Sequence, residues 1–417
     1  MHAIKTKARL NKKQYIQLRE ITYNARILRN KAINKIDTFY NENKAYLNHN
    51  RLRYIMKSDF HYKKINSNMA QEVLRSLDFN YKSFFKLLKN KKDGIYNKRV
   101  NKPKINYDNK YSVLYINKSQ IKINSKRNFT VPAPRGYYKN HEKIILHIPN
   151  YVNISDLKQI QIIPKNKAKF FAVHFIVDDE QIEVKNTTYN ALAIDYGINN
   201  FASCADSNGN TFIIDGLKLK SDNIFFFKKY SKIQQLKKKQ NHNFITRRQY
   251  KLMEKHNNIV DNFIKQTSRH IVNYCIKNNI NTIIVGYNTD FQQKAMLGNK
   301  INQIFTSHQF GKSRKQIKYL CSVNNVKYVE QEESYTSKAS FFDNDNIPVY
   351  DKNDNKKHTF SGTRITRGNY KTSNNKIINA DINGALNIMK KSKLIDDKIN
   401  ILQSKSCVNQ PKRIRVI

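Results

Sequence analysis

The chain has few of the features that mark secreted or membrane-spanning proteins. Among its 417 residues there are four cysteines, Cys204, Cys275, Cys321 and Cys407, and no two of them form a CxxC pair. No apolar run approaches the length of a transmembrane helix, and Met1–Lys7 contains no apolar signal core. These absences argue against a disulfide framework and favour reduced thiols in a cytoplasmic protein.

Acidic residues are scarce as well. There are 31 Asp and Glu residues against 77 Lys and Arg residues, which gives a formal net charge of +46. A bias toward Lys, Asn and Ile is typical of an AT-rich genome and accounts for part of this excess. The basic residues are spread along the whole chain, and no single basic amphipathic helix stands out, so the charge favours an extended nucleic acid over a membrane as partner.

The first half of the chain shows two kinds of apolar pattern. Residues 11–100 have the three- and four-residue spacing of basic helices, and residues 104–190 have short alternating runs punctuated by prolines. A strand near residues 2–10 is expected to join the second block, with the helical block as an insertion. One helical run predicts a buried stripe made of Met69, Val73, Leu74, Leu77, Tyr81, Phe84, Phe85 and Leu88.

The second half alternates between strand and helix patterns after a predicted hairpin. This order favours an RNase H-like α/β core with one antiparallel hairpin on a partly parallel sheet. Residues 340–378 are polar and are expected to be irregular, and the basic tail beyond 396 is expected to be loose. The expected strands are 192–195, 200–205, 211–215, 281–285 and 326–329, and the expected helical segments are 222–280, 309–323 and 381–392.

Two aspartates stand at positions suited to a metal site. Asp195 ends the apolar strand 192–195, and Asp381 begins the last helix. Hydrolysis of a phosphodiester by two divalent ions, about 3.5–4 Å apart, needs several carboxylates, and Mg²⁺ prefers oxygen ligands. Each aspartate alone is explained more simply, as a strand-end turn residue or a helix-capping acid. The pair in this order favours catalysis.

A third carboxylate is missing at the place where it is expected. The strand 281–285 is followed by Gly286. The strand 326–329 should lie beside it in parallel, about 4.8 Å away, so its end points to the same edge as Asp195. That end carries Glu332 and Glu333, and Asp290 follows Gly286 in the next loop. A relocated metal ligand and a solvated strand end are the two explanations for the acidic pair.

Several motifs together carry a family resemblance that covers nearly the whole chain. They are Ala70–Arg75, Ile194–Gly197, Tyr335–Lys338 and Asn379–Ile388. With these motifs the chain resembles the TnpB (OrfB) family, the RNA-guided nucleases that small insertion sequences encode and that are related to type V CRISPR effectors. The resemblance implies a RuvC nuclease domain, wedge and recognition domains, a structured guide RNA, and a short DNA motif read beside the target.

The chain departs from this family in two respects. The family usually has a glutamate where this chain has Gly286, and it usually has a four-cysteine zinc ribbon after the Thr-Ser-Lys motif, where this chain has no cysteine. No zinc is therefore expected. Some relatives, including the Fanzor branch, have a relocated glutamate three residues before the Thr, which corresponds to Glu333. The resemblance thus implies Mg²⁺, or Mn²⁺, held by Asp195, Glu333 and Asp381, with Glu332 and Asp290 as alternates.

The predicted fold class is α/β plus β-barrel. It consists of an RNase H-like (RuvC) nuclease core and an N-terminal β-barrel wedge domain that a helical recognition domain interrupts. The predicted parts are a wedge at 1–10 and 104–190, a recognition domain at 11–103, a nuclease core at 191–339 and 379–395, a degenerate zinc-ribbon-like insertion at 340–378, and a basic flexible tail at 396–417.

Basic clusters are the candidate nucleic-acid contacts. Such clusters suit an RNA–DNA heteroduplex that is recognised by its shape and backbone, with an affinity that falls as salt rises. A solvated charged face is the alternative for any one of them. The candidates are Lys86 and Lys89 in the first helical block, Lys237 and Lys238 in the second, Lys338 in the Thr-Ser-Lys motif, and Arg364 and Arg367 near the predicted active site.

The expected function is RNA-guided, Mg²⁺-dependent cleavage of DNA, with a guide RNA and target double-stranded DNA as partners in the cytoplasm, at the nucleoid. A cleavage-deficient, RNA-guided repressor is an alternative, because the usual glutamate is absent. A guide-independent transposase is a second alternative, which the large basic N-terminal blocks disfavour. The sequence gives no indication of protein partners.

Overall fold

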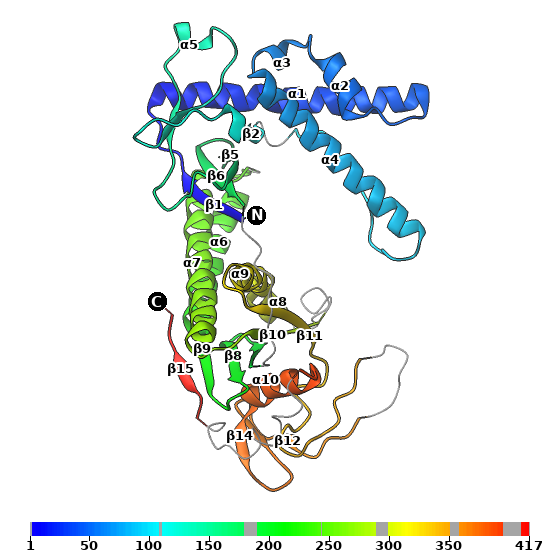
Figure 1. The fold of residues 1–417 in the computed structure, drawn as a ribbon, viewed down its shortest axis with the longest axis vertical. Coiled ribbons are helices and arrows are strands. Elements are labelled where there is room, and N and C mark those ends of the chain that lie inside the picture. Colours follow the sequence, from blue (N-terminus) through cyan, green and yellow to red (C-terminus); the bar gives the residue numbers. More distant parts are fainter. Residues whose placement is uncertain are drawn as a thin grey trace. The chain divides into compact units, whose positions relative to one another are not determined.

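A computed structural model gives the architecture in two compact units, Met1–Asp179 and Glu180–Ile417 (Figure 1). Each unit is described by itself below. Within the described residues, no helix is both long and apolar enough to cross a membrane. The structure describes residues 2–107, 111–178, 190–242, 244–288, 299–350, 358–394 and 410–416.

The helices of the first unit follow the predicted apolar spacing. They are α1 (Lys12–Asn43), α2 (His49–Met56), α3 (Phe60–Lys63) and α4 (Ser67–Lys92). Each begins after an Asn or Asp whose side chain accepts backbone N–H bonds of the first turn. The stripe on α4 is buried from Met69 to Tyr81, but Phe85 and Leu88 are exposed. The stripe is shorter than predicted because the last turns of α4 diverge from α1 (Figure 1).

The strands of the first unit form a four-stranded antiparallel sheet. Its order is β1-β6-β5-β2, with β1 (His2–Lys7) paired to β6 (Phe170–Val177). The expectation that a strand near residues 2–10 joins this module is therefore confirmed. A closed barrel stays a prediction, because the pairings of the described residues form an open sheet and a separate two-stranded one. The remaining strands are β2 (Leu114–Asn117), β3 (Asn128–Thr130), β4 (Ile145–His147) and β5 (Leu157–Lys165).

The second unit is built on a six-stranded mixed sheet with the order β11-β10-β7-β8-β9-β15. Strands β7, β8 and β9 are antiparallel neighbours, whereas β10 runs parallel to both β7 and β11. This arrangement confirms the predicted hairpin on a partly parallel sheet. The strands are β7 (Ala191–Tyr196), β8 (Asn200–Asp206), β9 (Thr211–Asp215), β10 (Thr282–Tyr287), β11 (Lys327–Glu332) and β15 (Lys412–Ile414).

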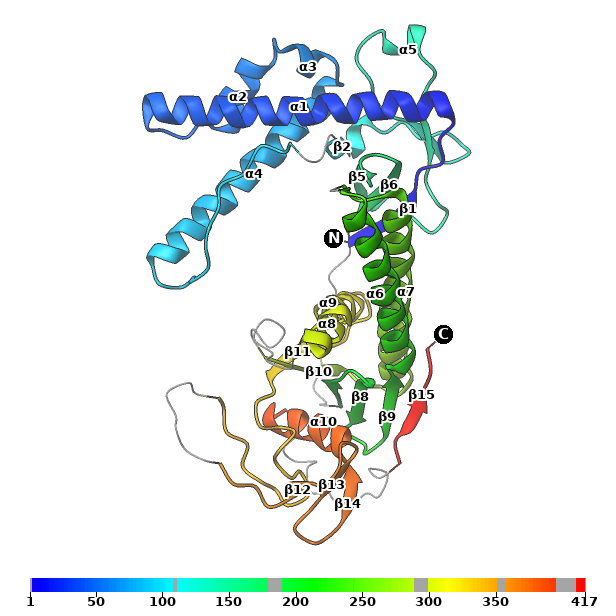
Figure 2. The ribbon, with the colours of Figure 1, turned by 180° about the vertical axis from the view of Figure 1, so that it is seen from behind.

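Helices cover both faces of this sheet. Ile194 packs in one core with α7 and α9, and Ala193 packs in the other with α10, so the middle strand β7 is apolar on both faces. Figure 2 shows α10 under the sheet edge, on the side away from α9. The helices are α6 (Leu217–Lys239), α7 (Arg247–Lys277), α8 (Asn299–Ser307), α9 (Phe310–Val323) and α10 (Ala380–Lys391).

The helical stretch expected at 222–280 is two helices. Helix α6 ends at Lys239, and Thr246 opens α7 with a capping box to Gln249. The polar sequence between the two helices contains no Pro, and both flanks have helical spacing, so the sequence pattern alone did not separate them.

Two segments expected to lack structure form strands. In and just after 340–378, β13 (Asn369–Lys371) pairs with β12 (Thr363–Arg364) on one side and with β14 (Ile377–Asn379) on the other, as a small antiparallel sheet. Only Tyr370 and Ile378 of these strands are buried, too few to give a strand pattern in the sequence. The expectation of a loose tail is wrong for β15, which pairs in parallel with β9.

Candidate carboxylate site

Asp195 lies near the end of the central strand β7, where α10 comes closest to the sheet. A Cβ atom at Gly384 of α10 would stand 2.5 Å from Oδ2 of Asp195. Only glycine leaves room for so close an approach. The glycine of the Asn379–Ile388 motif therefore brings the helix that carries Asp381 against the strand that carries Asp195.

Glu333, the residue directly after β11, reaches the same edge of the sheet. Strand β10 pairs Val285 with Ile194, so the next residues on the two strands are Gly286 and Asp195. A Cβ atom at Gly286 would stand 2.6 Å from Cδ1 of Ile388, and closer still to Oε2 of Glu333. The carboxylate of Glu333 thus occupies the space that a side chain at position 286 would need, in the neighbourhood of Asp195.

The neighbouring glutamate, Glu332, is engaged elsewhere. Its Oε1 accepts the backbone N–H of Ser334 at 2.7 Å, and its Oε2 forms an ion pair with Lys391, whose side chain is 5 % exposed. Hydrogen bonds from Lys391 and Ser334 outweigh partial burial and lower the pKa of Glu332. Glu332 therefore anchors the C-terminal end of α10 rather than facing Asp195.

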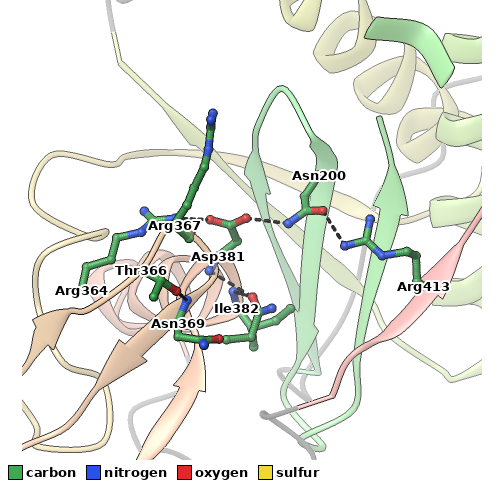
Figure 3. Close-up of polar contacts among 9 residues, drawn as sticks. Asn200, Arg364, Thr366, Arg367, Asn369, Asp381, Ile382 and Arg413 are labelled. Atoms are coloured by element: carbon green, nitrogen blue, oxygen red, sulfur yellow. Dashed lines mark hydrogen bonds and ion pairs between the residues drawn. The ribbon is translucent and has the colours of Figure 1, made fainter. Parts of the chain in front are cut away.

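Asp381 lies in the first turn of α10, which Asn379 caps. Figure 3 shows its carboxylate held from two sides. Oδ2 accepts a hydrogen bond from Nδ2 of Asn200 at 2.7 Å, and Oδ1 lies 2.9 Å from a guanidinium nitrogen of Arg364 on β12. The Oδ1 of Asn200 in turn accepts from Arg413 on β15 at 2.9 Å.

The carboxylates of this site repel one another. Burial, followed by the charges of Glu333 and Asp381, raises the pKa of Asp195 well above its ordinary value, against the opposing effect of Arg364. Burial also raises the pKa of Glu333 to about 7, against the opposing effect of Arg314. A divalent cation would relieve this repulsion, and an all-carboxylate donor set fits Mg²⁺ or Mn²⁺.

The carboxylates of Asp195, Glu333 and Asp381 are close together, but they do not point to one common position. Among the described residues, no group of three or more His, Cys, Asp and Glu side chains is placed to hold a metal ion. The carboxylate oxygens of Asp381 are instead engaged by Asn200 and Arg364. A metal at this site would require Asp381 to exchange Arg364 for the ion.

Side chains of α10 fix the loop that follows Glu333. The hydroxyl of Thr336 donates to the carbonyl of Glu333 at 2.8 Å. Asn387 donates to the carbonyls of Thr336 and Ala339, and Asn383 donates to that of Ala339, and both Asn side chains are fully buried. The Thr-Ser-Lys and Asn-Gly-Ala-Leu-Asn motifs are therefore two halves of one hydrogen-bonded structure that positions Glu333.

The other sequence candidates lie as follows. Lys86, Lys89, Lys238, Lys338, Arg364 and Arg367 are exposed, as phosphate contacts require. Lys237 is only 8 % exposed, so it does not present its charge to solvent as expected. Asp290 lies outside the described residues.

Three polar residues near the carboxylates were not predicted. Arg314 of α9 stacks over the ring of Tyr287 at 4.4 Å, and its charge opposes the rise that burial causes in the pKa of Glu333. Asn200 contacts Asp381 directly, and Arg413 contacts Asn200 from the other side. Asn200 stands five residues after Asp195, a spacing that could have drawn attention to it, whereas no sequence signal marks Arg413.

Comparisons with known proteins match two regions of the chain. Residues 174–292 match the family model OrfB_IS605, described as a probable transposase, and residues 310–388 match a Cas12f1-like TNB domain. A search of curated proteins finds no match. A cryo-EM structure of a Cas12f1–sgRNA–target DNA complex is similar at 16 % identity and a TM-score of 0.48, with 90 % of this chain and 82 % of that chain covered.

A second cryo-EM structure, of a CRISPR-Cas12f ternary complex, has 16 % identity and a TM-score of 0.28, with 90 % of this chain and 80 % of that chain covered. Neither structural similarity is close enough to assign a function. The two family models are adjacent along the chain, and together they include Asp195, Glu333 and Asp381.

Proposed function

Because the chain belongs to the TnpB-like proteins related to type V effectors, we propose that it is an RNA-guided DNA endonuclease of an insertion sequence, which cuts target DNA beside a short motif. The observation that carries the proposal is the placement of Glu333. Its carboxylate fills the space over Gly286, beside the strand end that carries Asp195. In this proposal Glu333, which directly follows the neighbouring strand, takes the role of the acid that the family usually has at position 286.

In this proposal the second unit is a RuvC-like, RNase H-like nuclease core at 191–339 and 379–395. The segment 340–378 is a target-loading insertion without zinc, and 396–417 is a basic tail of which β15 is docked. The first unit supplies a recognition domain at 11–103 and most of a β-barrel wedge at 1–10 and 104–190. The mixed sheet with α10 against its middle strand supports the nuclease assignment.

Asp195, Glu333 and Asp381 are the residues that would hold Mg²⁺ or Mn²⁺. Such ions, when bound, activate the attacking water and stabilise the leaving oxygen of the phosphodiester. The protein contributes fixed geometry: Gly384 admits α10 against Asp195, and Thr336 holds the backbone of Glu333. Arg364, once released from Asp381, is free to contact a phosphate of the bound strand.

Guide RNA and target DNA are the proposed partners. The exposed lysines at 86, 89, 238 and 338, with Arg364 and Arg367, are the proposed backbone contacts. A net charge of +46 supports binding along the length of a heteroduplex.

A guide-directed DNA-binding repressor without cleavage is the second candidate, and one observation favours it. Asp381 is paired with Arg364 and Asn200 instead of facing the other two carboxylates. In a nuclease the pairing with Arg364 breaks when metal and DNA bind, whereas in a repressor it persists.

Cleavage of a guide-matched plasmid separates the two candidates. The assay uses guide RNA from the native locus, Mg²⁺, and the wild type beside Asp195→Ala and Glu333→Ala. Glu330→Gln is the matched control, because Glu330 is an exposed acid on the same strand as Glu332. We expect the wild type and Glu330→Gln to cut, and the other two variants to bind the target without cutting.

Other results would change the conclusion. A Glu333→Ala variant that cuts normally would assign the third ligand to another acid. A wild type that binds the target in a guide-dependent manner, but cuts with neither Mg²⁺ nor Mn²⁺, would establish the repressor. Cleavage without any guide would indicate a guide-independent transposase.

A further inference from the structure

The C-terminal strand β15 brings a cation to the back of the carboxylate site. Arg413 lies opposite Ile213 in the parallel pairing of β15 with β9. One guanidinium nitrogen lies 3.2 Å from Oδ2 of Asp215, and another lies 2.9 Å from Oδ1 of Asn200. Asn200 and Asp215 are themselves a pair across β8 and β9, so a single guanidinium spans both strands. Figure 3 shows its contact with Asn200.

Arg413 decides which way the amide of Asn200 points. The two ends of an amide have the same size and differ only in that the oxygen accepts and the nitrogen donates hydrogen bonds. A guanidinium only donates, so the oxygen of Asn200 must face Arg413, and its NH₂ group then faces Oδ2 of Asp381 at 2.7 Å. The reversed amide would place an oxygen against the carboxylate.

We propose that Arg413 is a positioning residue of the nuclease site, which acts through Asn200 to hold the carboxylate of Asp381. The inference rests on the proposed metal site. Groups that orient a metal-binding side chain from behind typically contribute ten- to a hundredfold to metal affinity. The docked tail is then part of the site and not a loose extension.

A purely structural role for Arg413 is the competing explanation. The contact with Asp215, which is only 8 % exposed, would by itself tie β15 to the sheet. However, Ile414 and Val416 also pack against the core of the sheet, so β15 has attachment independent of Arg413. The contact with Asn200 is not needed for docking, and it is the one that points to Asp381.

The test measures Mn²⁺ binding to the full-length chain freed of nucleic acid. The unbound ion is quantified by its electron paramagnetic resonance signal. The variants are Arg413→Gln, Asn200→Ala, the double variant, and Asp381→Ala as the reference for loss of the site. Arg415→Gln is the matched control, since it removes the same charge from an exposed position two residues further on. Arg413→Lys keeps a side chain that only donates hydrogen bonds.

We expect Arg413→Gln and Asn200→Ala each to weaken Mn²⁺ binding about tenfold, and the double variant to be no weaker than Asn200→Ala alone. Arg415→Gln should bind like the wild type, and Arg413→Lys should retain most of the affinity. The Asn200→Ala substitution leaves β15 attached through the contact between Arg413 and Asp215. The Mn²⁺ affinity of this variant therefore stays informative even if Arg413→Gln releases the tail.

Three results would overturn the proposal. Wild-type affinity in Arg413→Gln would show that the tail does not position Asp381. An additional loss in the double variant would show that Arg413 acts by a route other than Asn200. Wild-type affinity in Asp381→Ala would show that Asp381 does not bind the metal. The proposed metal site would then fail together with the inference, whereas the first two results would leave that site intact.

Discussion

The carboxylate of Glu333 stands in the space that a side chain at Gly286 would occupy. Gly286 lies on β10, and Glu333 directly follows β11, the parallel neighbour of β10. The register places Gly286 beside Gln331, two residues before Glu333. The acid after one strand thus covers the glycine of the other. Position 286 needs to be glycine for as long as the acid comes from position 333.

Substituting Gly286 by Ala should impair cleavage. The new Cβ would lie within 2.6 Å of Ile388 and nearer to the carboxylate of Glu333, so Glu333 must move away from Asp195. We expect the cleavage rate to fall at least tenfold, with target binding unchanged. Single-turnover cleavage beside a filter-binding measurement checks this.

Exchanging the residues at positions 286 and 333 tests the same relationship. The double variant Gly286→Glu/Glu333→Gly places the acid on β10 and removes the carboxylate that fills the space above it, so that only the flexible end of Ile388 must still shift. It should cut faster than Glu333→Gly alone. A double variant as inactive as the single one, although folded, would mean that Glu333 does more than supply a carboxylate at this place.

The two neighbouring glutamates should separate stability from activity. Glu332→Gln leaves Lys391, which is 5 % exposed, without its anionic partner, so we expect a loss of about 1–3 kcal/mol in the free energy of unfolding. Glu333→Gln removes a buried, repelled charge, and without added metal it should unfold no more easily than the wild type while losing cleavage. Urea unfolding and cleavage, measured on both variants, check the pair.

The core of the second unit could be predicted because its signals are local. Asp195 follows an apolar strand, and Asp381 opens a helix that Asn379 caps, and each signal lies within a few residues of the acid. The direction of β11 beside β10 also followed from the parallel topology, and it brought Glu332 and Glu333 into consideration. Which of the two faces Asp195 was suggested by family resemblance, not by the strand pattern.

The remaining features depend on contacts between distant parts of the chain. Arg413 reaches Asn200 only because a three-residue strand pairs with β9, and a strand that short leaves no apolar pattern. The ion pair between Arg364 and Asp381 likewise depends on the small sheet that contains β12. Sequence periodicity reports burial, and these residues act from exposed or partly exposed positions.

Arg364 competes with metal for Asp381. Its guanidinium lies 2.9 Å from Oδ1 of that carboxylate, so a bound cation must displace it. Arg364→Gln should therefore bind Mn²⁺ about three to ten times more tightly in the nucleic-acid-free protein, a gain of about 1 kcal/mol typical of a partly exposed ion pair. Weaker binding in this variant would mean that Arg364 helps to assemble the site rather than to occupy it.

The buried Asn387 should matter for the position of Glu333 as well as for folding. Its side chain donates to the carbonyls of Thr336 and Ala339, and Thr336 in turn bonds the carbonyl of Glu333. Asn387→Leu leaves two buried carbonyls with fewer donors, which costs about 1–3 kcal/mol. We expect a lower urea midpoint together with slower cleavage under conditions where the variant is fully folded. Normal cleavage by the folded variant would contradict the positioning role.

His174 should make the first unit sensitive to acid. It lies on the central strand β6, between Lys5 of β1 and Gln161 of β5. Burial, with the charges of Lys5 and Lys165, lowers the pKa of His174 to about 4. Below the unfolded-state pKa of about 6.5 the unfolded chain takes up a proton that the folded chain does not, so stability from this residue is present at neutral pH and falls as the pH drops from 6.5 to 4.

The melting temperature of His174→Gln should fall less between pH 7 and pH 5 than that of the wild type does. His147, on β4 and exposed, provides the control variant His147→Gln, which should keep the wild-type pH dependence. An equal pH dependence in all three proteins would show that His174 is protonated as readily in the folded unit as in the unfolded chain.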